Sequence, residues 1–284
     1  MKESEGWFRD VEPGDLEGAR AAITDGRADE PRDWPAAAVE TGFAADTEEY
    51  YDALHGATLA ATRAAVAERE VADDRRLIHM VRAMDDCRRL SNELAERLAE
   101  WGSSVDEGGT GVEYARTVVA GESGPADPAV RSLADRVVDL ADEADRLEDD
   151  VERLAASVTP NLAALAGPVL AARLCSLAGG LESLAKKPSG TVQVLGAEDA
   201  LFAHLRGQAT SPKHGVIYTH DAVRGTRPED RGSAARALAG KLSIAARIDH
   251  YSGDRRPELE ADLAERIETI QARAGDGPEG DGHE

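Results

Sequence analysis

Basic side chains at helical spacing are the first residues in this sequence that could do chemistry. Gly232, Arg236, Gly240, Ser243 and Arg247 follow at steps of four, four, three and four residues, which places them on one face of a helix. Small residues between arginines allow close approach of another backbone, and arginine binds phosphate through paired hydrogen bonds. A phosphate backbone or a partner helix could lie along this stripe. Equally, the helix could pack on its own domain, with Arg236 and Arg247 paired to carboxylates.

More basic residues precede the stripe. Lys213-His214-Gly215 is followed by Arg224, Arg227 and Arg231 in a segment containing Gly and Pro, and binding groups are often found on such loops. The segment could follow one strand of an RNA stem, although scattered surface arginines would look the same. His204, His214 and His220 have neither metal-ligand spacing nor a carboxylate cluster beside them, so we expect no metal site.

The common enzyme motifs are missing from the sequence. It contains no Walker loop, Rossmann glycine fingerprint, nucleophile elbow or HExxH helix, which argues against the common enzyme classes. Cys87 and Cys175 fall inside helical apolar patterns and are predicted to be small buried hydrophobes. No basic start followed by an apolar stretch is present, and the longest Ala/Leu-rich region is broken by Pro168 and Arg173, so we expect a cytoplasmic protein.

Charge is distributed unevenly along the chain. Acidic residues outnumber basic ones by 55 to 33, a net charge of −22, and only five of the basic residues are Lys. Such a composition resembles proteins of salt-loving cytoplasms, where salt screens repulsion within the acidic surface and also long-range attraction to phosphate. Residues 160–256 nevertheless hold 13 basic against eight acidic residues. RNA or DNA binding is the simplest reason, although acidic segments added to a neutral domain would give the same numbers.

Ala and Leu dominate the apolar residues, which predicts a mainly helical fold. Two stretches follow alternating three- and four-residue steps, separated by GSS, GGTG and GESGP and a short helix at 112–120. They predict either two ordinary amphipathic helices packed together or a long antiparallel coiled coil that also homodimerises. The first stretch comprises Leu77, Met80, Met84, Cys87, Ser91, Leu94, Leu98 and Trp101. The dimer candidates of the second are Leu133, Val137, Leu140, Leu147, Val151 and Leu154.

These patterns divide the chain into four parts. Residues 1–45 form a small N-terminal region with aromatic anchors, and 46–157 form the coiled-coil domain. A helix-start signal at Thr159-Pro160-Asn161, with Thr159 as the cap, opens a domain over 158–256. Residues 257–284 form an acidic tail with one helical stretch and a disordered end.

Within 158–254, PNLAALAGPVLAARLCSLAGGLESLAKKPSGTVQVLGAEDALFAHLRG, PKHGVIYTH and RGSAARALAGKLSIAARIDHYSG closely resemble the Nop domain. Upstream, DDRRLIHMVRAMDDCRRLSNELAERLAEW resembles the first coiled-coil helix of the archaeal Nop protein of box C/D ribonucleoproteins. The resemblance spans the chain from about Glu48. It implies that TVQVLG at 191–196 is helical, despite its strand propensity.

The resemblance also implies a function. A Nop domain of this kind is all-helical and binds the composite surface that a kink-turn-binding protein of the ribosomal L7 type forms on box C/D guide RNA. The coiled coil homodimerises. The family's N-terminal domain holds a fibrillarin-like methyltransferase, which uses S-adenosylmethionine to methylate ribose 2′-hydroxyls of target RNA. The chain itself would be a scaffold without a cofactor and not an enzyme.

The resemblance also implies which residues form the binding sites, because each lies at a matching position of a family motif. Gly196, Ala197, Glu198, Asp199, Leu201 and Phe202 are similar to the family's GAEKALF signature and are expected at the kink-turn-protein interface. Lys213, His214, Arg224, Arg231, Arg236 and Lys241 match the basic region that faces RNA, and Arg247 joins them through the helical stripe. Arg and Lys on such a surface suit A-form RNA, which is read mainly through shape, phosphates and 2′-hydroxyls.

Three departures from the family pattern leave three hypotheses for the function of the chain. Asp199 and Ser233 stand where the family has Lys, the loop reads RPEDRGSA without tryptophan, and the region before the coiled coil is much shorter. A scaffold that still docks the methyltransferase is the leading hypothesis. An adaptor that binds an RNA–protein complex without the methyltransferase is the alternative, and an unrecognised enzyme is a third.

Overall fold

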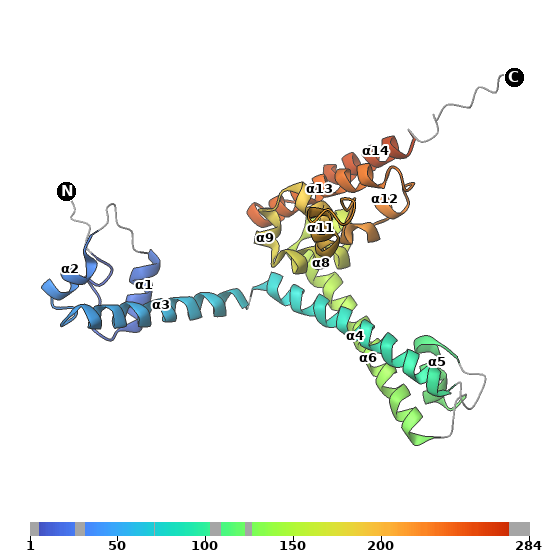
Figure 1. The fold of residues 1–284 in the computed structure, drawn as a ribbon, viewed down its shortest axis with the longest axis horizontal. Coiled ribbons are helices and arrows are strands. Elements are labelled where there is room, and N and C mark those ends of the chain that lie inside the picture. The colour runs from blue at the N-terminus through green and yellow to red at the C-terminus, as the bar shows by residue number, and fades with distance from the viewer. Residues whose placement is uncertain (1–5, 26–31, 71, 103–108, 123–126, 273–284) are drawn as a thin grey trace. The chain divides into compact units, whose positions relative to one another are not determined.

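The computed structural model describes residues 6–25, 32–70, 72–102, 109–122 and 127–272, and the chain forms two units. The first unit covers Met1–Ala72 and the second Asp73–Glu284. Every regular element of the described residues is helical, as Figure 1 shows, which confirms the mainly helical fold class. The sequence predicted a boundary between the first two domains at residue 45. The first unit in the structure extends to Ala72 and so includes the helix Thr47–Glu70.

The N-terminal unit contains α1 (Leu16–Asp25), α2 (Trp34–Glu40) and α3 (Thr47–Glu70). Its core is aromatic: Phe8 and Tyr50 are buried, and Trp7 and Phe43 pack around them, with the Phe8 and Phe43 rings stacked 5.3 Å apart. The Asp33 carboxylate caps α2 by accepting a hydrogen bond from the Ala36 N–H at 3.2 Å. The scattered aromatic anchors of the sequence therefore meet in one small cluster.

The second unit begins with a helical arm. Its long helices α4 (Asp73–Gly102) and α6 (Pro128–Val158) lie side by side and antiparallel, with α5 (Gly111–Ala120) at the far end, as Figure 1 shows. The buried Ser91 hydroxyl donates to the Val137 carbonyl at 3.1 Å and fixes the register between the two helices. Leu98, Val118 and Val130 form a separate core at the tip. The predicted pairing of the two heptad stretches is confirmed, whereas a coiled coil in the strict sense remains a prediction.

At the other end of the arm the chain folds into a compact helical domain around α13 (Arg231–Tyr251). Its other elements are α7 (Pro160–Ala166), α8 (Pro168–Ala178), α9 (Leu181–Ala185), α10 (Ser189–Val194), α11 (Glu198–Leu205), the 3-10 helix η1 (Val216–Thr219), α12 (Asp221–Arg224) and α14 (Glu258–Ala272). Ala234, Leu238, Leu242 and Ala245 of α13 are fully buried. One hydrophobic core joins this domain to the base of the arm.

Three local predictions from the sequence can be compared with this domain. Residues 191–194 of TVQVLG belong to α10, which confirms the predicted helix for the first four residues, whereas Leu195 and Gly196 form a turn. Leu259, Leu263, Ile267 and Ile270 form the buried face of α14, and residues 273–284, expected to be disordered, lie outside the described residues. Thr159 is not a side-chain cap, because its hydroxyl donates backward to the Ala155 carbonyl at 3.0 Å.

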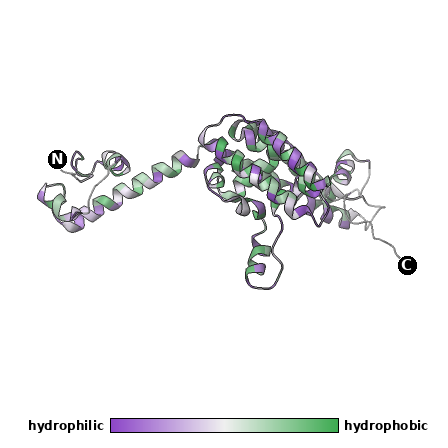
Figure 2. Ribbon diagram, turned by 90° about the horizontal axis from the view of Figure 1, so that it is seen from above, coloured by the Kyte–Doolittle hydropathy of each residue, from purple (hydrophilic) through white to green (hydrophobic). Residues whose placement is uncertain are grey.

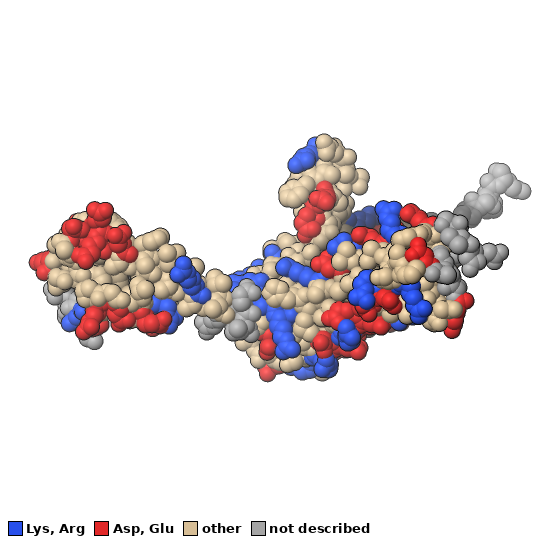
Figure 3. All heavy atoms as spheres, turned by 90° about the horizontal axis from the view of Figure 1, so that it is seen from below, with Lys and Arg blue, Asp and Glu red and all other residues tan. Residues whose placement is uncertain are grey.

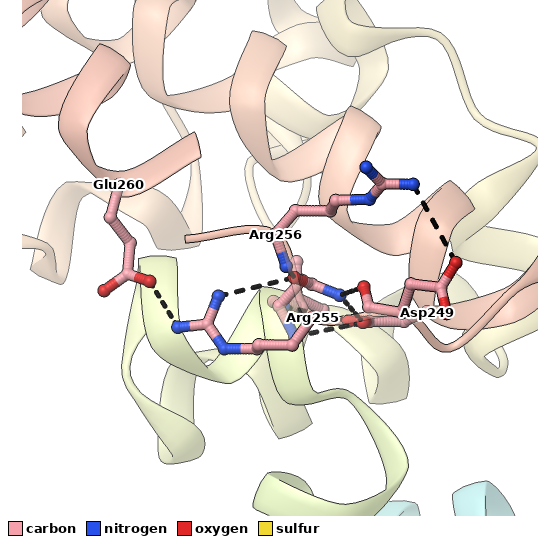
Figure 4. Close-up of polar contacts among 7 residues, drawn as sticks. Asp249, Arg255, Arg256 and Glu260 are labelled. Atoms are coloured by element: carbon pink, nitrogen blue, oxygen red, sulfur yellow. Dashed lines mark hydrogen bonds and ion pairs between the residues drawn. The ribbon is translucent and has the colours of Figure 1, made fainter. Parts of the chain in front are cut away.

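The start of α7 is instead held by Asp249 at the end of α13, in the buried polar network that Figure 4 shows. Among the described residues, no single helix is long and apolar enough to cross a membrane. The pair α7 and α8 passes that test together, but it is bent by 115° and supplies core residues.

Candidate nucleic-acid interface

The segment before α13 is fixed to α10 by backbone geometry. The Gly215 N–H donates to the Gln193 carbonyl at 2.9 Å, and the Val216 N–H donates to the Leu195 carbonyl at 2.7 Å. A Cβ atom at Gly215 would lie 2.0 Å from the Leu195 carbonyl oxygen, so only glycine fits. The Gln193 side chain also donates to the Lys213 carbonyl at 2.7 Å. Lys213 and His214 therefore project from a well-defined loop.

An aromatic and basic cluster forms where this loop meets the start of α13. The His214 and Tyr218 rings stack with centroids 4.7 Å apart, and the Arg231 guanidinium lies 5.4 Å from the centre of the Tyr218 ring. Arg231 also donates to the Thr226 carbonyl at 3.0 Å. Stacked rings flanked by cations suit an unpaired base with its phosphate, because every base has a π face.

The surroundings of the His214 ring disfavour its protonated form. Burial lowers the pKa of His214, and the neighbouring Arg231 and Lys213 lower it further. Lys213 itself reaches only the Pro228 carbonyl, at 3.5 Å. The cluster therefore places two cations beside an imidazole whose protonated form is disfavoured.

Arg236 lies on α13 four residues after Gly232, which packs against the Lys213 side chain. It is exposed and has no ion pair or hydrogen bond with any residue that the structure describes. Arginines of the arm differ, because most have a carboxylate partner. Examples are Arg88 with Glu148, Arg89 with Asp86, Arg116 with Asp142, Arg136 with Asp139 and Arg146 with Glu143. In a chain so rich in acid, an arginine left without a carboxylate is a candidate for an external anion.

The other three predicted RNA contacts bind within the chain. Arg224 pairs with Asp221 of its own helix at 2.7 Å, and Lys241 pairs with Asp262 of α14 at 2.6 Å. Arg247 donates to the Ala185 carbonyl at 3.1 Å and reaches the Lys187 carbonyl at 3.5 Å. The structure thus gathers Lys213, His214 and Arg231, adds Arg236, and engages the remaining candidates elsewhere.

The two ends of the stripe on α13 therefore have different surroundings. At its start, Gly232 lies against the Lys213 side chain, 3.7 Å from where a Cβ would stand. At its end, Ser243 is buried and donates to the Ala239 carbonyl at 2.9 Å. Packing within the domain therefore explains the second half, although Arg247 is tied to carbonyls and not to carboxylates. Of the two exposed arginines in the stripe, Arg236 has no partner among the described residues, whereas Arg247 already binds carbonyl groups of its own domain.

The GAEDALF motif forms a projecting helix, which Figure 2 shows standing out from the second unit. Gly196 has a φ of +84°, a conformation that favours glycine. Glu198 accepts a hydrogen bond from the Gly196 N–H at 2.8 Å and so fixes the start of α11. No residue of α11 is buried, and Phe202 and Leu205 are 56% and 71% exposed. Two large apolar side chains so exposed on one helix make α11 a candidate for contact with another protein.

The predicted dimer positions on α6 divide into two sets. Val137 and Val151 are fully buried within the chain and cannot contact a second copy. Leu133, Leu140, Leu147 and Leu154 are half-buried, so part of each side chain faces outward. Only this second set can contribute to a dimer.

Tyr218 and Gln193 are the contacts that sequence reasoning overlooked. Tyr218 stands inside the PKHGVIYTH motif between His214 and the arginines, and its aromatic type was the only signal available. Burial raises the pKa of the Cys175 thiol to about 12, in keeping with its prediction as a buried hydrophobe, whereas Cys87 is half-buried. No group of three metal-ligating side chains occurs among the described residues.

Residues 126–271 match the model of the family described as the Nop, snoRNA binding domain, fibrillarin family. That range covers the domain around α13, its projecting helix and the second helix of the arm. The chain belongs to the Nop family. On the face in Figure 3, acidic side chains gather on the N-terminal unit, whereas Lys and Arg are interspersed with them over the second unit.

Relatives of this Nop-family chain occur in archaea and eukaryotes. A NOP5 family protein of Methanocaldococcus jannaschii is 33% identical over 273 residues, which cover 82% of this chain and 66% of that protein. Nucleolar protein 58 of Scheffersomyces stipitis is 35% identical over 65% of this chain and 35% of its own length. The chain thus spans no more than two thirds of these relatives.

The fold is shared with a solved structure. A chain of a fibrillarin/Nop5p complex superposes with a TM-score of 0.55 and 24% identity, covering 89% of this chain and 92% of that one. This likeness confirms the helical Nop fold. The family model and these relatives indicate no enzyme family for the chain.

Proposed function

We propose that this chain is the scaffold subunit of a box C/D RNA-guided 2′-O-methylation ribonucleoprotein, in the cytoplasm of a salt-adapted cell. Its basic cluster of Lys213, His214, Arg231 and Arg236 would contact a kink-turn of the guide RNA. The projecting helix α11 would contact the kink-turn-binding protein of the ribosomal L7 type already bound there. A fibrillarin-like methyltransferase would then supply the chemistry and hold S-adenosylmethionine.

The proposal rests mainly on one observation. Cations without a carboxylate partner and an exposed apolar helix occur together within the range that matches the family model. RNA alone would need only the cations, and a protein alone would need only the apolar helix. A surface with both fits a composite of RNA and protein.

The names of the relatives support the same reading. They include nucleolar proteins 58 and 56 and a partner of fibrillarin in a solved complex. We further propose that the half-buried leucines of α6 mediate homodimerisation, and that the N-terminal unit docks the methyltransferase. The alternative is an adaptor that binds an RNA–protein complex without the methyltransferase.

Native-gel assembly at high salt tests the proposal. The chain is titrated into box C/D RNA alone, into the kink-turn protein alone and into their complex. We expect binding to the complex to exceed binding to either component by at least about a hundredfold. Equal affinity for bare RNA would remove the composite surface from the account.

The methyltransferase is then added and guided methylation is measured with and without this chain. Methylation that requires the chain supports the scaffold. A stable RNA complex that never recruits the enzyme supports the adaptor, and turnover by the isolated chain would overturn both.

A further inference from the structure

A buried carboxylate joins the end of α13 to the point where the arm enters the domain. The Asp249 side chain is 9% exposed and accepts hydrogen bonds from the Asn161 N–H at 3.0 Å, the Asn161 side-chain amide at 2.7 Å and the Leu162 N–H at 2.8 Å. Figure 4 shows Asp249 together with Arg255, Arg256 and Glu260 of the same network. Hydrogen bonds to a charged acceptor are about twice as strong as neutral ones.

The local sequence explains why α7 needs this carboxylate. The first N–H groups of a helix have no partner within the helix. Pro160 lacks an N–H, and Thr159 turns its hydroxyl back toward α6, so Asn161 and Leu162 remain to be satisfied. Asp249 supplies the cap from 88 residues away in the sequence. Because α6 continues into α7 through Thr159 alone, this cap fixes α13 to the base of the arm.

Asn161 extends the connection beyond α13. Its side-chain oxygen Oδ1 accepts a hydrogen bond from the Arg256 N–H at 2.6 Å, and its side-chain Nδ2 donates to the Asp254 carbonyl at 2.8 Å. The loop that leads from α13 to α14 is thus tied to the same point.

The other polar ties between arm and domain are more exposed. Arg173 pairs with Asp85 at 2.5 Å, with side chains 28% and 43% exposed, and Arg82 donates to the Ser176 hydroxyl at 2.9 Å. Exposed charge pairs are screened at high salt, whereas a buried hydrogen-bonded carboxylate is screened much less. The Leu181 N–H of α9 also donates to the Asp74 carboxylate of α4 at 3.0 Å, but this contact is only partly buried. Among the described residues, the Asp249 cap is therefore the most buried of these polar ties and the one least screened by salt.

We propose that Asp249 is a positioning residue, which holds the RNA-facing start of α13 at a fixed angle to the α4 and α6 arm. Arg236 lies 13 residues before Asp249 on the same helix, roughly 20 Å away at the usual rise. A helix anchored at one end transmits its orientation to the other. The part of this inference that concerns RNA rests on the proposed function, whereas the angle is a property of the chain itself.

Spin-label distances test the angle in the full-length protein without RNA. Labels are placed at the exposed positions Arg136→Cys on α6 and Ile244→Cys on α13, with Cys87→Ser to remove the half-buried thiol. The parent is expected to give one narrow distance distribution at molar salt. Asp249→Asn should broaden or shift it, because an amide cannot accept from all three donors. Asp254→Asn, which removes an exposed carboxylate five residues on, is the matched control and should leave it unchanged.

A second variant, which removes only part of the hydrogen-bond network, provides a milder test of the same inference. Asn161→Ala keeps the backbone bonds to Asp249 but removes the ties to Asp254 and Arg256, and it should broaden the distribution less than Asp249→Asn. Narrow parental distributions in both variants would overturn the inference.

Assembly separates this inference from the proposed function. Asp249→Asn should bind kink-turn RNA carrying its protein within about twofold of the parent, since the basic cluster lies at the other end of α13, yet guided methylation should fall about tenfold or more. Unchanged methylation with a broadened distance would overturn the positioning role. Failure of the parent to bind that RNA overturns the proposed function without altering the distance result.

Discussion

The first and last halves of α13 differ in what their polar side chains contact. At the start, Arg236 has no described partner and Arg231 lies over the Tyr218 ring. Toward the end, Arg247 binds two carbonyls of the segment around α9 and Asp249 caps α7. The same helix thus leaves an arginine without a described partner at one end and holds the domain together at the other. Residue type does not separate these roles, but the available partners do.

The largest effect should follow from removing the anchored end. Asp249→Ala leaves three buried donors without an acceptor and should lower the free energy of unfolding by about 3 kcal/mol. Arg236→Ala removes an exposed side chain and should change it by less than about 0.5 kcal/mol. Urea unfolding of both variants measures the contrast, and equal losses would abolish the distinction between the two ends.

RNA assembly should show the opposite ranking. Arg236→Ala should weaken binding to kink-turn RNA carrying its protein by about tenfold, because a charge-assisted phosphate contact is lost. Lys241→Ala should weaken it by no more than about twofold, since Asp262 already holds that ammonium. Arg266→Ala, an exposed arginine of α14 with no described partner, controls for charge alone. Gel-shift titration at fixed salt would count against the assignment if all three behaved alike.

The projecting helix extends the comparison to a surface that faces a protein. Phe202→Ser should weaken the ternary assembly by about tenfold while leaving affinity for bare RNA unchanged, because Phe202 is 56% exposed and contributes little to the core. Leu90→Ser is a suitable control, since Leu90 is exposed and lies on α4 of the arm. Loss of folding in Phe202→Ser, seen by circular dichroism, would mean that α11 is structural.

The sequence predicts the helices of this chain better than it predicts the contacts between their side chains. Periodicity alone predicted both long helices, because an apolar residue every three or four positions has few other interpretations. The first four residues of TVQVLG become helical against their propensity because Val192 packs into the core around α13.

Arg236 and Arg247 could not be told apart in the same way. They occupy equivalent positions of one stripe, and what separates them is the carbonyls that another segment brings to Arg247. Tyr218 was missed for a related reason, since its stack on His214 depends on a turn that no periodic pattern announces. Such tertiary partners cannot be read from spacing.

A glycine substitution can show how far the proposed RNA-binding surface extends along α13. Gly240 has no atom within 4 Å of where its Cβ would stand, so Gly240→Ala should raise the free energy of unfolding by about 0.5 to 1 kcal/mol through helix propensity. Assembly with RNA should remain within about twofold of the parent if the contact surface ends before this turn. A drop in assembly despite the added stability would extend the RNA surface along the helix.

The smallest effect concerns pH. The pKa of His214 is lowered in the folded chain, so below about pH 6.5 the unfolded chain binds more protons and stability falls as pH falls. Above that range the imidazole is neutral in both states and contributes no pH dependence. His214→Phe should therefore flatten the loss of thermal stability between pH 7 and pH 5. An identical profile in parent and variant would assign that slope to other groups.

Ultraviolet crosslinking of the assembled complex tests the central claim most directly. Box C/D RNA carrying the kink-turn protein is irradiated with the full chain, and the attached nucleotides are located by mass spectrometry. We predict adducts on the 213–236 segment, with Tyr218 and His214 foremost because aromatic rings stack on bases. Adducts confined to the second half of α13, or to the arm, would contradict an RNA surface at the start of this helix.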